Sequence, residues 1–80
     1  MKKILLSDYD YSMGIFIDLS NSKVVGSSMD VSYEDLLINH SELLDKSKKY
    51  YIYCKGGIKS RKAVNILEFY GYDVVLVYVE

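Results

Sequence analysis

Residues 50–57 read Tyr-Tyr-Ile-Tyr-Cys-Lys-Gly-Gly, and this stretch decides the fold. Its first four residues are typical of a β-strand, and the two glycines end that strand just after Cys54. From Lys59 onward the apolar residues recur at helical spacing, and Gly71 is well suited to end the helix. Residues 74–79 are apolar on both faces, which is typical of a strand inside a parallel sheet covered by helices. Strand, helix and strand in succession predict a βαβ unit.

The part of the chain before this unit predicts shorter elements. Residues 4–7 and 15–19 are apolar runs that predict strands, and residues 29–31 predict a further short strand. Ser32 is followed by Tyr-Glu-Asp, which is typical of a capped helix start with acids in the first turn. Residues 40–44 predict a second short helix.

The totals restrict the class of protein. The length leaves room for one domain, so we expect residues 1–80 to form a single α/β domain with a small, mainly parallel sheet of four or five strands flanked by helices. A net charge of −1 lacks the basic excess of a general nucleic-acid binder. No apolar run approaches the roughly 20 residues of a membrane span, and the apolar run at the N-terminus is shorter than the roughly 7–15 residues of a secretion signal. We therefore expect a cytoplasmic protein without nucleic-acid or membrane partners.

The cysteine count limits the kinds of site. One cysteine excludes an internal disulfide, and one cysteine with one histidine argues against a structural metal site. We expect no metal and no cofactor. A lone cysteine in the cytoplasm stays reduced and available for chemistry.

Cys54 is the candidate for that chemistry because of its position. In open parallel sheets ligands lie beyond the C-terminal ends of the strands, and a helix N-terminus offers unpaired N–H groups and a positive dipole. Both features of the helix favour a thiolate over a thiol, and Gly56 and Gly57 allow the backbone to form an anion-binding nest. Cations crowd the same loop and the first helical turn, where they oppose the helix dipole: Lys55, Lys59, Arg61 and Lys62.

These features predict that Cys54 is a nucleophile of low pKa in a loop that binds a small oxyanion or a persulfide. The alternative is a structural cysteine buried beside a turn, which is a common environment for a free cysteine. The strand end, double glycine, basic cluster and helix start together favour the functional interpretation.

Several stretches resemble the rhodanese-like sulfurtransferase family. Residues 54–60 read Cys-Lys-Gly-Gly-Ile-Lys-Ser and resemble the active-site loop of single-domain members, which have Cys, two variable residues, Gly, one variable residue, a basic residue and Ser. Residues 17–19 resemble the family's Ile-Asp-Val, and residues 26–33 resemble its Gly-Ala-Ile-Asn-Ile-Pro stretch. Residues 67–75 resemble the end of its last helix and strand. The resemblance covers about residues 15–79.

This resemblance implies a five-stranded, mainly parallel sheet with helices on both faces. It also implies that Cys54 takes a sulfane sulfur from a small anion such as thiosulfate or a polysulfide and passes it to cyanide, a thiol or a protein acceptor. Asp18 and Arg61 are candidates for supporting the loop, although Asp18 is as well suited to cap its own turn. The two lysines of the loop attract the anionic donor, and the residues implied in substrate binding are Lys55, Gly56, Gly57, Ile58, Lys59 and Ser60.

Departures from the family pattern favour a second function. Ser20 stands where members usually have Arg, and the Gly-His-Ile-Pro-Gly segment lacks its His and Pro. The alternative is therefore a non-catalytic rhodanese-like module that binds a partner or senses redox state. Related phosphatases have a loop one residue longer that ends in Arg. Here Arg61 comes one place late, which argues against phosphatase or arsenate reductase chemistry.

The remaining conspicuous residues have simpler interpretations. His40 is expected at the surface or as part of a helix cap. If residues 74–79 formed an edge strand, they would be open to pairing with another chain. Most of the tyrosines are expected to pack in the core, including Tyr50, Tyr51 and Tyr53. Others are candidates for a partner surface: Tyr9, Tyr11, Tyr70 and Tyr78.

Overall fold

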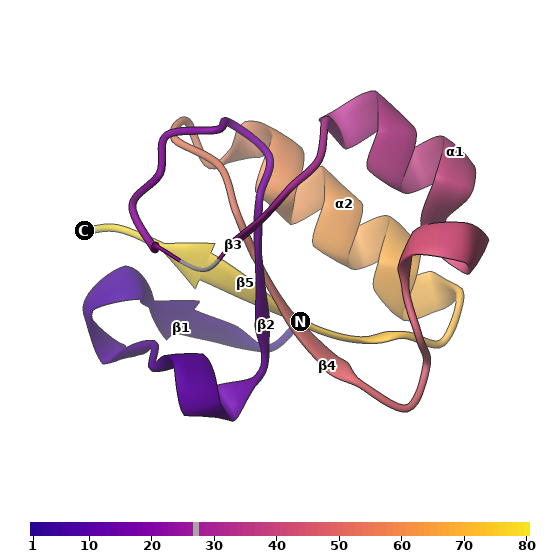
Figure 1. The fold of residues 1–80 in the computed structure, drawn as a ribbon, viewed down its shortest axis with the longest axis horizontal. Helices are drawn as coiled ribbons and strands as arrows, with labels where there is room; N and C mark the ends of the chain where they lie inside the picture. The colour runs from indigo at the N-terminus through magenta and orange to yellow at the C-terminus, as the bar shows by residue number, and fades with distance from the viewer. Residues whose placement is uncertain (27) are drawn as a thin grey trace.

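A computed structural model describes residues 1–26 and 28–80 and contains five strands joined into one sheet (Figure 1). The strands are β1 (Lys3–Leu5), β2 (Ile15–Asp18), β3 (Ser28–Asp30), β4 (Lys49–Tyr53) and β5 (Asp73–Tyr78). The α-helices are α1 (Tyr33–Leu43) and α2 (Ile58–Phe69), and two 3-10 turns precede β2, η1 (Leu6–Asp8) and η2 (Tyr11–Met13). Ser27, within the stretch that resembles Gly-Ala-Ile-Asn-Ile-Pro, lies outside the described residues.

The strands are ordered β1-β5-β4-β2-β3, and each of the neighbouring pairs in the described residues is parallel. This confirms the predicted small, mainly parallel α/β sheet of four or five strands, and the structure has five. β5 lies between β1 and β4, so it is not an edge strand, and the pairing with another chain considered for residues 74–79 does not apply. β4 is the central strand, so its C-terminal end lies in the middle of the sheet edge where parallel-sheet sites form.

The predicted βαβ unit is confirmed as β4, α2 and β5. Ala63, Val64 and Leu67 are fully buried, so this face of α2 packs on the sheet. The helix ends in a Schellman motif, in which the N–H of Tyr72 donates to the carbonyl of Leu67 at 3.0 Å. Gly71 adopts φ +95°, a left-handed conformation that favours glycine, which explains why it ends the helix.

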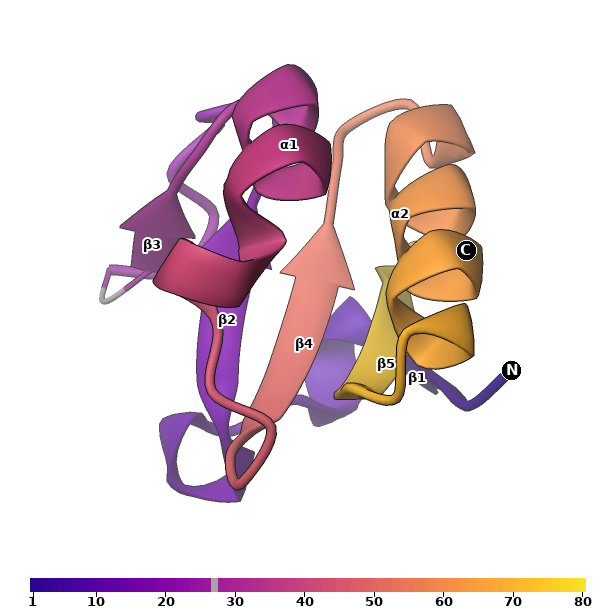
Figure 2. The same cartoon turned by 90° about the vertical axis from the view of Figure 1, so that its right-hand side faces the viewer.

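Both α-helices cover the same face of the sheet (Figure 2). The opposite face carries Phe16, Tyr51 and Val77, and the N-terminal segment packs over them through Leu6 and Tyr9. The expectation of helices on both faces is therefore met by α-helices on one face only, and on the second face, among the described helical elements, only the 3-10 turn η1 packs, through Leu6. In the sheet, β5 and β4 lie between β1 and β2, so the connection from β1 to β2 must cross both of them. It has only residues 6–14 to do so, which leaves no room for a longer helix.

The helix predicted to start after Ser32 is present, and the Ser32 hydroxyl accepts a hydrogen bond from the Asp35 N–H at 3.1 Å. The second helix predicted over residues 40–44 is instead the last part of α1. The backbone of Asn39 leaves helical geometry (φ −111°, ψ 22°), so α1 is kinked between the two predicted pieces. No helix in the described part of the chain combines the length and apolar character needed to cross a membrane.

Candidate functional site

Cys54 directly follows β4 and precedes the loop that leads into α2. Cys54 is 7 % exposed, so the residue is nearly covered while it remains at the boundary of two cavities. The structure therefore places Cys54 where the sequence predicts it, between the C-terminal end of a buried strand and a helix N-terminus.

The sulfur of Cys54 is the focus of the loop's hydrogen bonds. The N–H groups of Gly57 and Ser60 donate to Sγ at 3.1 Å and 3.3 Å. The Ser60 hydroxyl lies 3.4 Å from Sγ and 3.3 Å from the carbonyl oxygen of Gly57. As a thiol Cys54 donates to that hydroxyl, and as a thiolate it can accept from it.

Gly57 is the residue that turns the loop toward the sulfur. Its φ of +79° is left-handed, a conformation that only glycine adopts without strain, and it immediately precedes the first residue of α2. Its own N–H donates to both the carbonyl and the sulfur of Cys54, at 3.3 Å and 3.1 Å. The loop therefore curls back over Cys54 as an anion nest.

These contacts decide the direction of the thiol pKa. Burial raises the pKa of Cys54, but hydrogen bonds from the Ser60 hydroxyl and from the N–H groups of Ser60, Gly57 and Lys59 together lower it by more. As a result, the pKa of Cys54 lies below its ordinary value. A larger fraction of Cys54 is therefore thiolate at neutral pH than of a free cysteine.

One cavity, of about 260 Å³, opens beside the sulfur on the β2 side. Lys55 and Lys59 contribute positive charge to its wall, and Leu19 and Ile58 contribute apolar surface. A second cavity of about 250 Å³ lies on the β5 side of the same loop and includes Arg61. Cys54 borders both, so a small anion can approach its sulfur from a positively charged surface.

The contacts of Asp18 decide between the alternatives that the sequence left open. Asp18 is 1 % exposed, and its carboxylate accepts hydrogen bonds from the N–H groups of Ser20, Ser22 and Lys23 at 3.0–3.1 Å. These bonds cap the turn after β2, and no direct bond from Asp18 to the Cys54 loop is found among the described residues. Within the described residues, the hydrogen bonds that link Asp18 to that loop run through Ser20.

Ser20 makes this link, and sequence reasoning missed its role. Its hydroxyl donates to Asp18 at 2.9 Å and accepts from the N–H of Lys55 at 3.1 Å, joining the turn after β2 to the Cys54 loop. The available signal was its place two residues after the strand aspartate, where the family pattern has Arg. The Lys55 N–H is thus held by Ser20 rather than turned to the sulfur.

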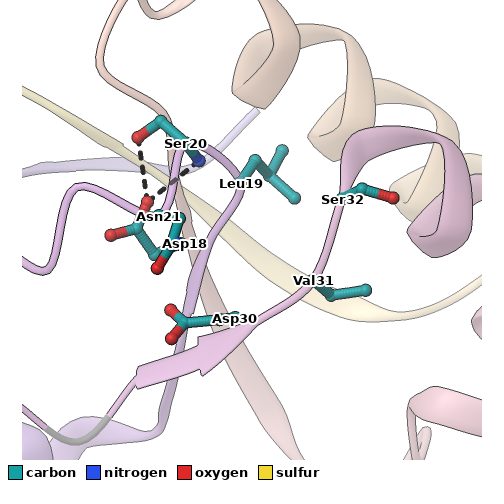
Figure 3. Close-up of a pocket in the computed structure, with 7 residues that line it drawn as sticks. All are labelled: Asp18, Leu19, Ser20, Asn21, Asp30, Val31 and Ser32. Carbon is teal, nitrogen blue, oxygen red and sulfur yellow. Dashed lines mark hydrogen bonds between the residues drawn. The ribbon is translucent and has the colours of Figure 1, made fainter.

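A hollow of about 270 Å³ lies on the other side of this turn. Figure 3 shows the residues that line it, with the Asp18 carboxylate bonded to Ser20. Leu19 and Ser20 line both this hollow and the cavity at Cys54. The far wall of the hollow carries Asp30 of β3. The surface around the turn therefore changes from basic at Cys54 to acidic at β3.

His40 lies at the other end of the molecule from Cys54. Its Nδ1 is 2.8 Å from the Tyr72 hydroxyl and its ring stacks on Tyr70, two residues that follow the C-terminal end of α2. It is half-buried in this aromatic cluster, a packing role that the sequence did not predict. Among residues 1–26 and 28–80, no three His, Cys, Asp or Glu side chains are grouped so as to hold a metal ion.

Sequence comparison finds no match, either to a protein-family model or to a curated protein. Comparison with solved structures finds several similar proteins. The chain is similar to a rhodanese-related protein from Thermoplasma volcanium, with a TM-score of 0.85, 21 % identity and coverage of 99 % of this chain and 85 % of that one. It is also similar to a Rhodanese_3-like domain from Anabaena sp., with a TM-score of 0.67, 25 % identity and 82 % coverage of each chain.

A third similar structure belongs to a larger protein. An NAD-dependent persulfide reductase from A. fulgidus matches with a TM-score of 0.73 and 15 % identity, and the match covers 98 % of this chain but 14 % of that one. The five-stranded parallel sheet and these structural matches confirm the resemblance seen in the sequence. The chain is a small α/β domain with the rhodanese-like fold.

Proposed function

We propose that this chain is a small sulfurtransferase or persulfide carrier that takes a sulfane sulfur onto Cys54 and passes it to a thiol or to cyanide. The observation that carries the proposal is the convergence of the Gly57 and Ser60 N–H groups on the Cys54 sulfur at the edge of a basic cavity. Amide donors and nearby cations stabilise an anionic sulfur, which is the reactive form in sulfur exchange.

The first step loads the cysteine. The Cys54 thiolate attacks the outer sulfur of thiosulfate, the sulfur–sulfur bond of thiosulfate breaks, and sulfite leaves with the bonding electrons. A polysulfide donor reacts in the same way and loses a shortened polysulfide. Lys55 and Lys59 attract the anionic donor through their side chains, and the amide groups of residues 56–60 hold the terminal sulfur of the resulting persulfide.

The second step removes the outer sulfur from Cys54. An acceptor thiolate or cyanide attacks the outer sulfur of the persulfide, the bond between the two sulfurs breaks, and its electrons return to Cys54 as a thiolate. Neither step consumes a proton or an oxidant, which suits a site where backbone amides and a serine hydroxyl, rather than a histidine, contact the Cys54 sulfur. The substrate-binding residues of this proposal are Lys55, Gly56, Gly57, Ile58, Lys59 and Ser60.

Two further points support the proposal. One similar structure is named as a persulfide reductase, so a domain of this fold occurs in a protein that acts on persulfides. The single thiol also suits the cytoplasm, where we place the reaction, because thiols stay reduced there. Transfer to a protein acceptor is part of the same proposal.

The test is an intact-mass measurement after incubation with thiosulfate or polysulfide. We expect one added sulfur that cyanide removes and that the Cys54→Ser variant does not acquire. If the wild-type chain acquires no sulfur from either donor while remaining folded by circular dichroism, the sulfurtransferase proposal fails.

One observation favours a second function, a non-catalytic rhodanese-like module that binds a partner or senses redox state. The turn after β2 offers the cavity a serine, Ser20, instead of a cationic side chain, and Cys54 is buried, with 7 % of the residue exposed. A sulfur-free result in the mass measurement, together with reversible oxidation of Cys54 by peroxide, would support this module.

A further inference from the structure

The charges of the chain are unevenly distributed. Residues 46–67 contain seven of the ten Lys and Arg residues and none of the eleven Asp and Glu residues, although the net charge is −1. Neither ion pair found within the described residues involves the basic residues near Cys54. These exposed cations lie in the Cys54 loop and the first turns of α2: Lys55, Lys59, Arg61 and Lys62.

The same helix exposes large apolar side chains. Phe69 is 86 % exposed and Ile58 is 68 % exposed, and Ile66 lies between them at 36 %. Positions 58, 62, 66 and 69 fall on one side of a helix, so Ile58, Ile66 and Phe69 project on the same side as Lys62. Among the helices and strands of the described residues, Figure 2 shows none over the side of α2 that is turned away from the sheet. We call Ile58, Lys62, Ile66 and Phe69 the outer face of α2.

The outer face is continuous with the candidate site. Ile58 is both the first residue of α2 and part of the wall of the cavity at Cys54. A molecule that covers the outer face therefore also reaches the edge of that cavity. A small anion would need only the cavity and would leave Ile66 and Phe69 in water.

The chemistry of this face selects a class of partner. Apolar anchors beside cations fit a surface that combines apolar residues with carboxylates. Nucleic acid fits less well, because a phosphate backbone is bound by several spaced cations, and beyond Lys62 the outer face continues with Ile66 and Phe69. Exposed apolar side chains that lie together on one face also mark interaction sites more often than isolated ones do.

We propose that the outer face of α2 docks an acidic protein with an apolar anchor, and that this protein presents the thiol that takes sulfur from Cys54. The docking itself follows from charge and exposed apolar surface, whereas the sulfur step rests on the proposed function. In that step the partner's thiolate attacks the outer sulfur of the Cys54 persulfide, and the bonding electrons return to Cys54.

The test measures docking without sulfur chemistry. Two fluorescent peptides of equal length, one built from Glu and Leu and the other from Lys and Leu, both without cysteine, are titrated with the full chain by fluorescence anisotropy. We expect the acidic peptide to bind more tightly than the basic one and to weaken as salt is raised. Phe69→Ala and Lys62→Glu should each weaken its binding about fivefold.

Matched controls separate this face from the rest of the surface. Tyr11, at 79 % exposure, is an equally exposed aromatic residue on the N-terminal segment, and Lys48 is an exposed lysine at the opposite end of β4. Tyr11→Ala and Lys48→Glu should leave binding of the acidic peptide unchanged. Equal binding of the two peptides, indifference to Phe69→Ala and Lys62→Glu, or preferred binding of duplex DNA or anionic lipid vesicles would overturn the proposal.

A second experiment tests whether docking on the outer face promotes transfer of sulfur from Cys54. The acidic peptide is given one cysteine, and its rate of sulfur uptake from the loaded chain is compared with that of cyanide. Phe69→Ala should slow uptake by the peptide about fivefold and leave uptake by cyanide unchanged, and Lys62→Glu should slow uptake by the peptide more than uptake by cyanide. If Cys54 never loads but the acidic peptide still binds the outer face, the proposed function fails and the docking surface stands. If Cys54 loads but the acidic peptide is not preferred, the docking surface fails and the proposed function stands.

Discussion

The C-terminal region, residues 49–78, and the N-terminal region, residues 1–32, meet in one sheet but carry different parts of the site. The C-terminal region supplies Cys54, the amide donors to its sulfur and the neighbouring cations. The N-terminal region supplies the turn after β2, which holds the Cys54 loop through Ser20. The chemistry is thus local to one βαβ unit, whereas its positioning depends on a contact between distant parts of the chain.

The two regions should differ most in their contribution to stability. Leu67 is fully buried between α2 and the sheet, whereas Leu6 is half-buried over the opposite face. Leu67→Ala should lower the free energy of unfolding by about 3 kcal/mol. Leu6→Ala should lower it by roughly 1 kcal/mol. Urea denaturation followed by circular dichroism measures both, and equal losses would show that the two faces of the sheet contribute alike.

The next effect concerns the donors to the sulfur. Ser60→Ala removes the hydroxyl beside Sγ and should raise the pKa of Cys54 toward its ordinary value. The pH dependence of iodoacetamide alkylation, read by mass, reports this pKa for the chain's single cysteine. Ser41→Ala, an exposed site on α1, is the control that should leave the profile unchanged.

The same depressed pKa links pH to stability. Because the folded-state pKa of Cys54 lies below its unfolded value, the thiolate stabilises the fold fully above the unfolded value. That contribution is lost as pH falls through the folded value. The stability difference between the wild-type chain and Cys54→Ser should therefore shift in favour of wild type as pH rises between the two values. A difference that is flat with pH would mean that the pKa is not depressed.

A smaller effect is expected at the glycines of the loop. Gly56 and Gly57 both have open space where a side chain would extend, but only Gly57 has a left-handed φ, of +79°. Gly57→Ala should cost about 1 kcal/mol in unfolding free energy and slow sulfur loading, because its amide donates to Sγ. Gly56→Ala is the matched control for stability and should change the free energy of unfolding little, because Gly56 has open space and no left-handed φ. Similar effects of the two substitutions would contradict the role assigned to the left-handed turn.

The C-terminal and N-terminal regions also differ in how much of their structure could be predicted from the sequence. β4, α2 and β5 are long, regular patterns bounded by glycine, and their predicted ends fall within one or two residues of the observed ones. Cys54 and its loop followed from that placement. The Schellman end at Gly71 likewise follows from a local requirement for glycine.

Long-range features could not be predicted in this way. The position of β5 between β1 and β4 depends on strand pairing, which apolar runs do not specify. The link between Ser20 and Lys55 joins residues 35 positions apart, and a serine after a strand has many ordinary uses. The covering of the second sheet face by Leu6 and Tyr9 likewise depends on the sheet order, which brings the N-terminal segment over that face.

The smallest effect tests the contact between the regions. Ser20→Ala removes the acceptor for the Lys55 N–H, but that amide is near the surface and water can replace the hydroxyl. We expect a loss of less than about 1 kcal/mol in stability, faster hydrogen exchange of the Lys55 amide and modestly slower sulfur loading. Ser20→Thr, which keeps the hydroxyl, should restore most of the protection. Unchanged exchange in Ser20→Ala would show that the two regions are not joined there.

The central claim is that backbone amides hold the Cys54 sulfur as an anion that can accept and release sulfur. The pH at which the lone cysteine becomes half-reactive toward iodoacetamide, measured on the folded chain and again in denaturant, tests it most directly. We predict a midpoint clearly lower in the folded chain than in the denatured one. A folded midpoint equal to or above the denatured one would contradict the claim.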